Sequence, residues 1–300
     1  MPRDATAPVR ITARAKLNLY LHVLGRRDDG YHLIDSLVVF AAAHDTVAVR
    51  PAADLSLAAN GAFAQGLPPG ADNIAIKAAL RLAAVAGGAR GAAIALTKEL
   101  PVASGIGGGS ADAAATLAAL VRLWDLDLPQ ATLHALALEL GADVPVCLHG
   151  RAAFMGGIGE AIAPCPPLPK LPLVLVNPGV PVATADVFRA RRGEFSQPGR
   201  FDEAPADIAA LARLLGSRRN DLTDAARSIA PAIGEALRAL NAAGSALARL
   251  SGSGATCFGI FADPAAAQTA ARRIAAAQPD RKSTRLNSSH LKLSRMPSSA

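Results

Sequence analysis

The chain has 300 residues, of which 51% are hydrophobic and 18% are charged. This composition is too apolar for a disordered chain, and the length allows one large domain or two ordinary ones. The net charge is +7, but five of the 31 cations and none of the 24 acids lie in residues 281–300, which leaves 26 cations against 24 acids in residues 1–280. Aromatic residues are only 4%, too few for the stacking platforms of single-strand binders. The nearly neutral body argues against a nucleic-acid partner.

Cysteine usage and the first residues bear on the compartment. Cys147, Cys165 and Cys257 lie far apart, without a C-x-x-C pair or a histidine at metal-ligand spacing, which favours reduced thiols in a cytoplasmic protein. The first ten residues lack the apolar core of an export signal, and no uncharged apolar run reaches the roughly 18 residues of a membrane span. We therefore expect a cytoplasmic protein without a membrane partner.

The first half of the chain mixes strands and helices. Residues 11–24 alternate between apolar and polar, which predicts a half-buried strand with Lys16 and Asn18 side by side on its polar face. An Asp29-Gly30 turn follows. We further expect strands at 37–40, 46–50, 54–58 and 92–97, and helices at 72–86 with Asp72 as the N-cap, at 110–124 and at 129–140.

A proline-rich stretch then divides the chain. Five prolines in residues 163–172 indicate an extended linker or a domain edge. Beyond it we expect strands at 173–177, 246–250 and 256–261, and helices at 183–190, within 207–241 and at 264–277. The uneven order of strands and helices is typical of an α+β fold. The predicted domains are residues 1–164 and 165–280.

The most informative stretch is residues 101–114, PVASGIGGGSADAA. Four glycines within five positions precede a long helical pattern, so several backbone N–H groups can converge beside the positive end of a helix. This arrangement predicts a phosphate-binding loop, because glycine lets the backbone approach an anion closely. No lysine follows the glycines as in a Walker loop, and the loop does not leave a strand directly as in the dinucleotide fingerprint. A flexible linker or a glycine-rich helix cap is the alternative.

Three other constellations are ambiguous when each is taken alone. Asp143 lies in GADVPV (residues 141–146) and is either a catalytic carboxylate or the N-cap of a short helix. Lys16 with Asn18 is either functional or a solvated pair on an exposed sheet face. The stretch LSGSGATCF (residues 250–258) is either a hairpin turn or a second nest of N–H donors.

Together these pieces resemble one family. In order and spacing, AKLNLYL, DDGYH, P-x-x-x-G-x-G-G-G-S-A, GADVPV and S-G-S-G resemble the GHMP small-molecule kinases, over about residues 10–277. The glycine loop alone specifies only the superfamily, whereas AKLNL with GYH and GADVPV resembles the branch that phosphorylates a cytidyl diphosphate in the non-mevalonate isoprenoid pathway. The resemblance implies an ATP-dependent kinase with a two-domain GHMP fold and an active site between the domains.

The resemblance also implies roles for matching residues. Asp143 would be the catalytic base that takes a proton from the substrate hydroxyl, and Lys16 would lie beside it and stabilise the developing negative charge, as phosphoryl transfer requires. The implied substrate-binding residues are Asn18, Tyr31, His32, Asp143, Thr184 and Phe188, with Tyr31 and His32 reading the cytosine and Phe188 on the opposite side of its ring. The implied ATP-binding residues are Asn73, Lys98, Pro101, Gly105, Gly107, Gly108, Gly109, Ser110 and Ala111. Residues 251–254 would lie against the glycine loop.

Magnesium is implied as the counter-ion of the ATP phosphates, with Ser110 as a candidate ligand. Two departures from the family pattern stand out. Ala103 and Ser104 occupy places where relatives often have glycine, at positions that need not all have positive φ. Residues 281–300 match nothing in the family, so we expect an appended, disordered segment in place of a final strand.

Two other functions remain open. One is another GHMP-type kinase, for homoserine or mevalonate, although such a kinase is not expected to carry GYH with a paired aromatic residue for a nucleobase. The other is a basic RNA-binding module, whose binding would depend on residues 281–300. We expect a small-molecule substrate, no nucleic acid or membrane partner, and a monomer or weak homodimer.

Overall fold

The computed structural model describes residues 7–88 and 90–277. They form two compact units that interleave along the sequence. Among the described residues, unit 1 comprises 7–15, 44–88, 90–102 and 107–150, and unit 2 comprises 16–43, 103–106 and 151–277. The two longest strands, β1 (Val9–Arg26) and β2 (His32–Arg50), contribute residues to both units.

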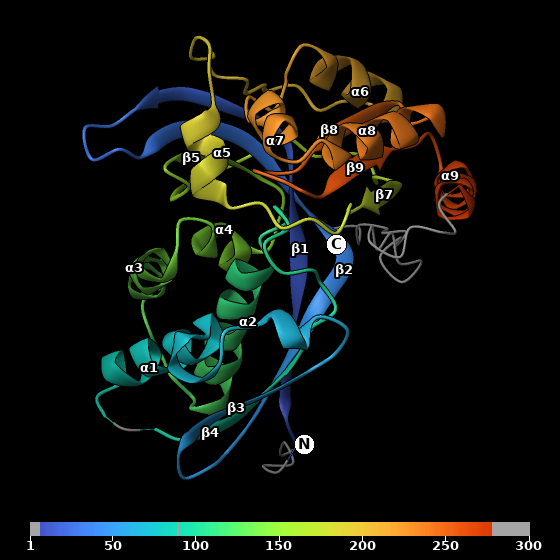
Figure 1. Cartoon of the computed structure of the whole chain (residues 1–300). Coiled ribbons are helices and arrows are strands. Elements are labelled where there is room, and N and C mark those ends of the chain that lie inside the picture. The colour runs from blue at the N-terminus through green and yellow to red at the C-terminus, as the bar shows by residue number, and fades with distance from the viewer. Residues whose placement is uncertain (1–6, 89, 278–300) are drawn as a thin grey trace. The chain divides into compact units, whose positions relative to one another are not determined.

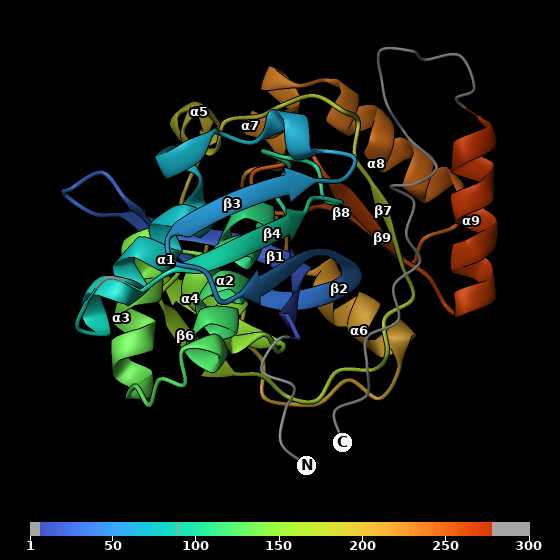
Figure 2. The same cartoon turned by 90° about the horizontal axis from the view of Figure 1, so that it is seen from below.

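Unit 1 contains a sheet formed by the second half of β2, β4 (Ala92–Thr97) and β3 (Leu55–Asn60). β4 runs antiparallel to β2, with Thr46 opposite Thr97, and β3 runs parallel to β4, with Leu55 opposite Ala92. β3 and β4 lie side by side in Figure 2. Along β4, Ile94 and Leu96 are buried while the residue between them is exposed, which is the period of a strand with one face in the core.

Four α-helices complete unit 1. They are α1 (Ile74–Val85), α2 (Gly108–Leu123), α3 (Gln130–Leu140) and α4 (Val144–His149), and two short 3-10 turns precede α1 at Ala64–Gly66 and Gly70–Asp72. α2 packs against α1 and α4, and α1 and α2 lie together in Figure 1. Because the buried face of α2 is mostly alanine, neighbouring helices can approach it closely. α2 is therefore a central element of this core, and the glycine loop leads directly into it.

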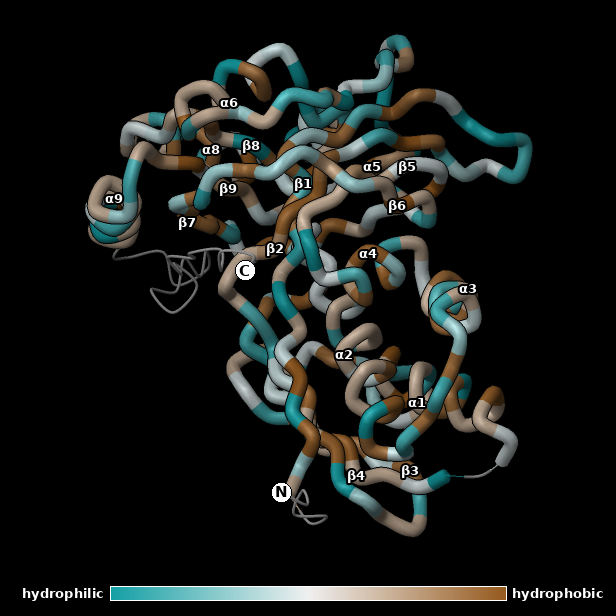
Figure 3. The backbone as a smooth tube through the Cα atoms, turned by 180° about the vertical axis from the view of Figure 1, so that it is seen from behind, coloured by the Kyte–Doolittle hydropathy of each residue, from teal (hydrophilic) through white to brown (hydrophobic). Residues whose placement is uncertain are grey.

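Unit 2 contains two groups of strands. The first half of β2 pairs with β5 (Ala153–Gly157), which pairs with β6 (Ala161–Pro164), both antiparallel. A separate antiparallel sheet has the order β7 (Leu173–Val176), β9 (Cys257–Ile260) and β8 (Leu247–Leu250). Every residue of β7 and β9 is buried, and both strands are largely apolar (Figure 3). This three-stranded sheet is the centre of the core of unit 2.

The described residues of unit 2 contain five helices: α5 (Thr184–Ala190), α6 (Ile208–Gly216), α7 (Thr223–Ile229), α8 (Ala232–Ala242) and α9 (Pro264–Ala276). α8 packs against all three strands of the sheet, and α9 packs against β7. Asp207 and Asp263 cap α6 and α9, because their carboxylates accept hydrogen bonds from the N–H groups of Ala210 and Ala266.

The sequence predicted most of these elements, and the α+β class is confirmed. The strand at 92–97 has the predicted bounds, and the predicted strands and helices of the second half are present to within a few residues. Two strands expected at 37–40 and 46–50 are parts of the single strand β2, and the sequence missed β5 and β6. Asp45, between the two predicted strands, is fully buried within β2.

Two local predictions are corrected. The N-cap of α1 is Asn73, whose side chain accepts a hydrogen bond from the N–H of Ala75, because Asp72 belongs to the preceding 3-10 turn. Ala103 has a φ of 50°, so this departure from glycine does occupy the left-handed region that favours glycine.

The predicted domain boundaries and the predicted tail are not tested by the structure. The predicted domains, 1–164 and 165–280, are contiguous in sequence, whereas the compact units interleave; this division stays a prediction. The expected appended segment at 281–300 lies outside the described residues. Within the described part of the chain, no helix is both long and apolar enough to span a membrane.

Candidate active site

The glycine loop presents an uncapped helix end. Gly107 is the N-cap of α2 with a left-handed φ of 63°, and no side chain caps the helix. The first turn of any helix has N–H groups without an intrahelical acceptor, which here belong to Gly108, Gly109 and Ser110. These groups add to the positive end of the α2 dipole, and together they favour an anion. Gly109 is exposed and Ser110 is half-buried, so this end of α2 is open to an anion, and the binding of a phosphate here stays a prediction.

The middle of the loop rests on the S-G-S-G stretch. The N–H of Thr256 donates to the carbonyl of Ser104 at 3.0 Å, and the Ser251 hydroxyl donates to the carbonyl of Gly105 at 3.0 Å. A Cβ on Gly105 would lie 2.5 Å from the Ser251 carbonyl oxygen and 2.6 Å from the Gly254 nitrogen, so only glycine fits there. The stretch 251–254 therefore lies against the glycine loop, as the resemblance implied.

Lys16 adjoins the same loop. Its N–H donates to the carbonyl of Ile106 at 2.8 Å, and its ammonium donates to Oδ1 of Asn18 at 3.1 Å. The Asn18 amide in turn donates to the Ser36 hydroxyl at 2.8 Å. Lys16 is 3% exposed and Asn18 is fully buried, so the alternative of a solvated pair on an open sheet face is wrong. Both polar atoms of the Asn18 side chain have partners within the protein, which makes Asn18 a support for Lys16.

Asp143 is at the predicted helix start but does not act as a cap. It precedes α4 with helical backbone angles (φ −87°, ψ −11°), and its side chain makes no capping hydrogen bond. The interpretation of Asp143 as a capping aspartate is therefore not what the structure shows. Asp143 belongs to unit 1 and Lys16 to unit 2, so their predicted proximity stays a prediction.

The residues expected to read a nucleobase are partly brought together. The His32 and Phe188 rings stack, with their centroids 4.9 Å apart and their planes at 25°. Burial lowers the pKa of His32, and Arg26 and Arg191 lower it further, so the imidazole is neutral near neutral pH. A neutral imidazole offers one donor and one acceptor nitrogen, which suits hydrogen bonding to a base edge.

Tyr31 and Thr184 occupy different surroundings. Tyr31 is 59% exposed, and its N–H donates to the carboxylate of Asp29. Thr184 begins α5, and its hydroxyl shares a 2.8 Å hydrogen bond with the Ser253 hydroxyl. The structure therefore joins the start of α5 to the S-G-S-G stretch, which the sequence did not predict.

Two residues expected near the adenine are engaged elsewhere. The Lys98 ammonium is 2.6 Å from Oδ2 of Asp45 and 2.7 Å from Oδ2 of Asp112, and Lys98 is 1% exposed. Asn73 is 2% exposed, and its Oδ1 accepts the capping hydrogen bond of α1 at 2.9 Å. Their side chains therefore have structural partners within unit 1.

The remaining predicted ATP-binding residues flank the glycine loop. Pro101 is half-buried at the start of the loop. Ala111 is 3% exposed, and its N–H makes the first helical hydrogen bond of α2, to the carbonyl of Gly107 at 2.8 Å. Because that N–H is used within the helix, contact of Ala111 with a nucleotide stays a prediction.

Sequence reasoning missed the residues that hold these segments in place. The Asn220 amide donates to the carbonyls of Leu250 at 2.9 Å and Gly252 at 2.8 Å, which fixes the S-G-S-G stretch. The guanidinium of buried Arg249 donates to the carbonyls of Leu19, Leu215 and Arg218 at 2.7–3.0 Å. Burial lowers the pKa of Arg249 to about 10, with a further contribution from Arg218, so it stays charged at neutral pH. No local pattern marks either residue, because their partners are distant in sequence.

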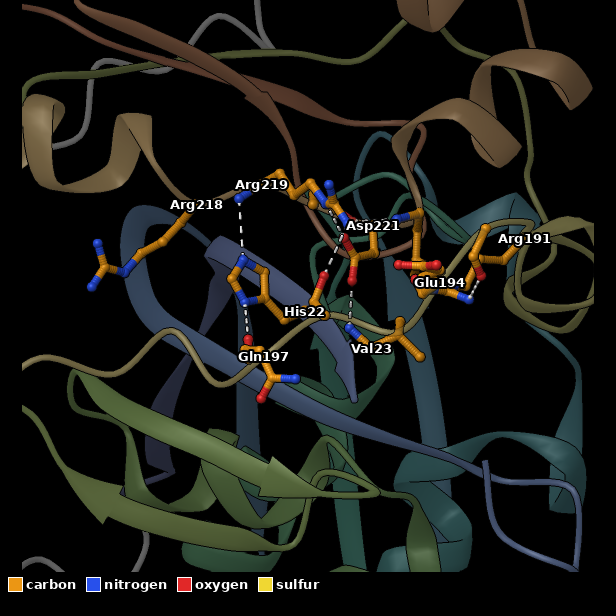
Figure 4. A network of polar contacts seen from close by, with 12 residues as sticks. His22, Val23, Arg191, Glu194, Gln197, Arg218, Arg219 and Asp221 are labelled. Carbon is orange, nitrogen blue, oxygen red and sulfur yellow. Dashed lines mark hydrogen bonds and ion pairs between the residues drawn. The ribbon is translucent and has the colours of Figure 1, made fainter. Parts of the chain in front are cut away.

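The end of β1 is hydrogen-bonded to the segment after α5 and to the turn between α6 and α7 (Figure 4). His22 Nδ1 is 2.8 Å from the Gln197 carbonyl, and His22 Nε2 accepts from the Arg219 N–H. The N–H of Val23 donates to the Asp221 carboxylate at 2.7 Å, which also accepts from the Arg219 side chain. These bonds connect the strand that carries Lys16 to residues far along the chain.

Comparison with known proteins places this fold in a family. A family model described as "GHMP kinases N terminal domain" matches residues 73–151, and a second one, "GHMP kinases C terminal", matches residues 203–280. A protein of Paramagnetospirillum magneticum, 4-diphosphocytidyl-2-C-methyl-D-erythritol kinase, is 54% identical over 270 residues, which cover 90% of this chain and 94% of the relative. The chain belongs to the GHMP kinase family. This GHMP kinase is accordingly a phosphotransferase that uses ATP.

Two further proteins resemble this GHMP kinase closely. A protein of Rhodospirillum rubrum with the same name is 57% identical over 256 residues, which cover 85% of this chain and 84% of the relative. A crystal structure of 4-(cytidine 5'-diphospho)-2C-methyl-D-erythritol kinase superposes with a TM-score of 0.72 at 35% identity, over 89% of this chain and 95% of that one. The glycine loop, α2 and α4 lie within the N-terminal family match, and the S-G-S-G stretch lies within the C-terminal one.

Proposed function

We propose that this GHMP kinase transfers the γ-phosphoryl group of ATP to the 2-hydroxyl of 4-diphosphocytidyl-2-C-methyl-D-erythritol, giving the 2-phosphate and ADP. The reaction is a step of the non-mevalonate isoprenoid pathway. The observation that carries the proposal is the similarity to a relative named for this substrate. The two sequences are 54% identical, and the match covers 94% of the relative. The nearly neutral charge of residues 1–280 and the glycine loop at a helix N-terminus agree with a small-molecule kinase.

ATP binds with its phosphates at the start of α2. The uncapped N–H groups of Gly108, Gly109 and Ser110 and the helix dipole supply the binding energy for negative charge. Gly105 holds the loop against the S-G-S-G stretch, where a side chain would collide with backbone atoms. Adenine contacts involve the region of Asn73, Lys98, Pro101 and Ala111, through backbone groups and shape, since the side chains of Asn73 and Lys98 have partners in the protein.

Asp143 and Lys16 carry out the chemistry. Asp143 accepts the proton of the substrate 2-hydroxyl while that oxygen forms its bond to the γ-phosphorus, and the bond from the γ-phosphorus to the bridging oxygen of ADP breaks. Lys16 stabilises the negative charge on the transferring group, and Asn18 holds the Lys16 ammonium in place.

The cytidyl group binds at His32, Phe188, Tyr31 and Thr184. Phe188 stacks on the cytosine ring with the face that now lies against His32. The neutral His32 imidazole then hydrogen-bonds the polar edge of the base. Exposed Tyr31 closes on the other face of the ring. Thr184, held by Ser253, hydrogen-bonds the base or ribose, and Asn18 lies at the polyol end.

Mg²⁺ is part of the proposal as the counter-ion of ATP, where it neutralises the phosphates during transfer. Among the residues that the structure describes, no group of three or more His, Cys, Asp and Glu side chains could hold a metal. The nucleotide phosphates would therefore supply most of the ligands of the ion, and the Ser110 hydroxyl would be the ligand from the protein. We also propose a cytoplasmic protein that works as a monomer or weak homodimer and binds no nucleic acid.

Activity assays of two variants test the mechanism. Asp143→Asn and Lys16→Ala are each expected to lower kcat by at least about 100-fold, because each removes a group that acts on the reacting atoms. Both variants should still bind ATP in calorimetry. Asp224→Asn, at a carboxylate that is 98% exposed on α7, is the control and should retain full turnover. Near wild-type turnover of either catalytic variant contradicts the assignment.

Competition by nucleotides separates the proposal from a homoserine-type or mevalonate-type kinase. CDP and CMP should compete with the phosphoryl acceptor, because they carry the cytosine that His32 and Phe188 read. Phe188→Ala should weaken this inhibition while KM for ATP stays unchanged. If neither CMP nor CDP competes, or if homoserine or mevalonate is phosphorylated in place of the cytidyl substrate, the proposal is wrong.

A further inference from the structure

A buried ion cluster, Asp45–Lys98–Asp112, lies inside unit 1 and has no role in the proposed chemistry. The Lys98 ammonium lies 2.6 Å from Asp45 and 2.7 Å from Asp112, and the exposed fractions of the three residues are 1% or less. The main chain of Lys98 is also engaged, since its N–H donates to the Asn60 carbonyl and its carbonyl accepts from the Phe63 N–H. Such a cluster costs desolvation, and replacing it with apolar residues often stabilises a protein. Stability alone therefore does not explain it.

The cluster contacts the chain at both ends of the glycine loop. At the start of the loop, Oδ1 of Asp45 accepts the N–H groups of Glu99 at 2.6 Å and Leu100 at 2.7 Å. At the end of the loop, Asp112 lies on the second turn of α2, which begins at Gly108.

Lys98 joins these two anchors, because its ammonium bonds both carboxylates. Gly108 lies close to Lys98 and to Leu100: a Cβ atom added to it would be 3.2 Å from the Lys98 ammonium nitrogen and 3.8 Å from Cβ of Leu100. The two ends of the loop are therefore packed against each other through one lysine side chain.

We propose that Asp45, Lys98 and Asp112 are positioning residues that hold the two ends of the glycine loop at the separation that phosphate binding requires. This inference rests on the proposed function, because it assigns the loop to the phosphates of ATP. Fixing the ends of residues 101–107 removes conformational freedom before the ligand arrives, and a loop that is already ordered loses less entropy on binding. The Lys98 side chain therefore serves the nucleotide through the loop, because its ammonium is paired with the two carboxylates.

Asp112 differs from Asp45 in one respect. Its Oδ1 is buried and accepts no hydrogen bond from any described residue, whereas both oxygens of Asp45 are used. Asp45 therefore holds the loop through three bonds and Asp112 through one. Loss of the Asp45 carboxylate is expected to be the larger perturbation of the loop.

Calorimetric titration with ATP, and competition with adenosine, test the positioning role. Asp45→Asn is expected to raise Kd for ATP about tenfold, because the amide cannot accept both N–H groups and the Lys98 ammonium at once, while Kd for adenosine changes less than about twofold. The milder Asp112→Asn keeps one acceptor for Lys98 and should raise Kd for ATP about threefold. With saturating ATP, both variants should keep kcat within about twofold of wild type, because neither group touches reacting atoms.

Asp35→Asn is the matched control. Asp35 is a buried carboxylate of unit 2 that accepts the Gly199 N–H, the Tyr20 hydroxyl and the Arg200 guanidinium at 2.7–2.8 Å, so its loss should lower the melting temperature and leave Kd for ATP unchanged. If ATP affinity stays within about twofold of wild type in both cluster variants, or if ATP and adenosine lose affinity equally, the positioning role is wrong. Should Asp45→Asn not fold, Asp112→Asn decides the matter.

Failure of the proposed function is a separate result. It would appear as absent turnover of the wild-type protein with the cytidyl substrate, whereas the cluster is tested by nucleotide binding alone.

Discussion

Asp112 makes the stability of unit 1 depend on pH in an unusual direction. The pKa of Asp112 is raised to about 7, chiefly because the carboxyl is buried. The Lys98 ammonium opposes this shift, and the Asp45 carboxylate adds to it. An aspartate in an unfolded chain has a pKa of about 3.9. Between these two values the folded protein holds a proton that the unfolded chain has released, so the free energy of unfolding falls as pH rises through this window.

The size of the effect follows from the two pKa values. The full difference of about 3 pH units corresponds to about 4 kcal/mol, and somewhat more than half of it, roughly 2 to 3 kcal/mol, falls between about pH 5 and about pH 8. Asp112→Asn cannot titrate, so the free energy of unfolding of wild type relative to this variant should fall by roughly 2 to 3 kcal/mol over that range. The variant is therefore expected to gain relative stability as pH rises.

Urea unfolding followed by tryptophan fluorescence measures this difference. The single tryptophan, Trp124, is the C-cap of α2, so its emission reports on the helix that carries Asp112. Asp224→Asn removes an exposed carboxylate and should leave the pH profile of wild type unchanged. Parallel profiles for wild type and Asp112→Asn from about pH 5 to about pH 8 would refute the reasoning, because they would mean that the buried carboxyl does not titrate there.

Three further substitutions test other parts of the structure. Arg249→Met should lower the free energy of unfolding by about 3 kcal/mol, measured in urea, because three carbonyls lose a buried charged donor. Gly105→Ala should lower both the melting temperature and the affinity for ATP, because its Cβ would lie 2.5 Å from the Ser251 carbonyl oxygen; an unchanged affinity would contradict the packing of the loop. Ala103→Gly should raise the free energy of unfolding by about 0.5 kcal/mol, since glycine adopts the left-handed φ of 50° without steric cost; a loss of stability would show that this residue is unstrained.

Local patterns were sufficient for the parts of the fold that depend on near neighbours in sequence. The alternation in residues 11–24 predicted β1, and the glycines before an alanine-rich helix predicted a phosphate loop at the start of α2. They did not join the strands predicted at 37–40 and 46–50 into the single strand β2. Asp45 lies buried between them, and its charge is compensated by Lys98, 53 residues further along the chain.

For the site, the sequence named the residue types and the structure decided their use. Lys98 was expected near the adenine because it matches a position of the family, and its side chain is instead buried and paired with Asp45 and Asp112. Asp143 had the sequence environment of a helix cap, and its side chain makes no capping bond. Asn220 and Arg249 had no sequence signal, since their partners are backbone carbonyls of distant segments.

The amino-acid sequence by itself therefore determined the α+β class, most of the elements, the glycine loop that leads into α2 and the family, because each depends on spacing along the chain. It also placed five of the cations in residues 281–300, which left a nearly neutral body. Only the tertiary structure decided which charged groups are buried and paired. A side chain binds a ligand or holds the fold according to the groups that surround it in space, and for Lys98 those groups are two carboxylates from other elements.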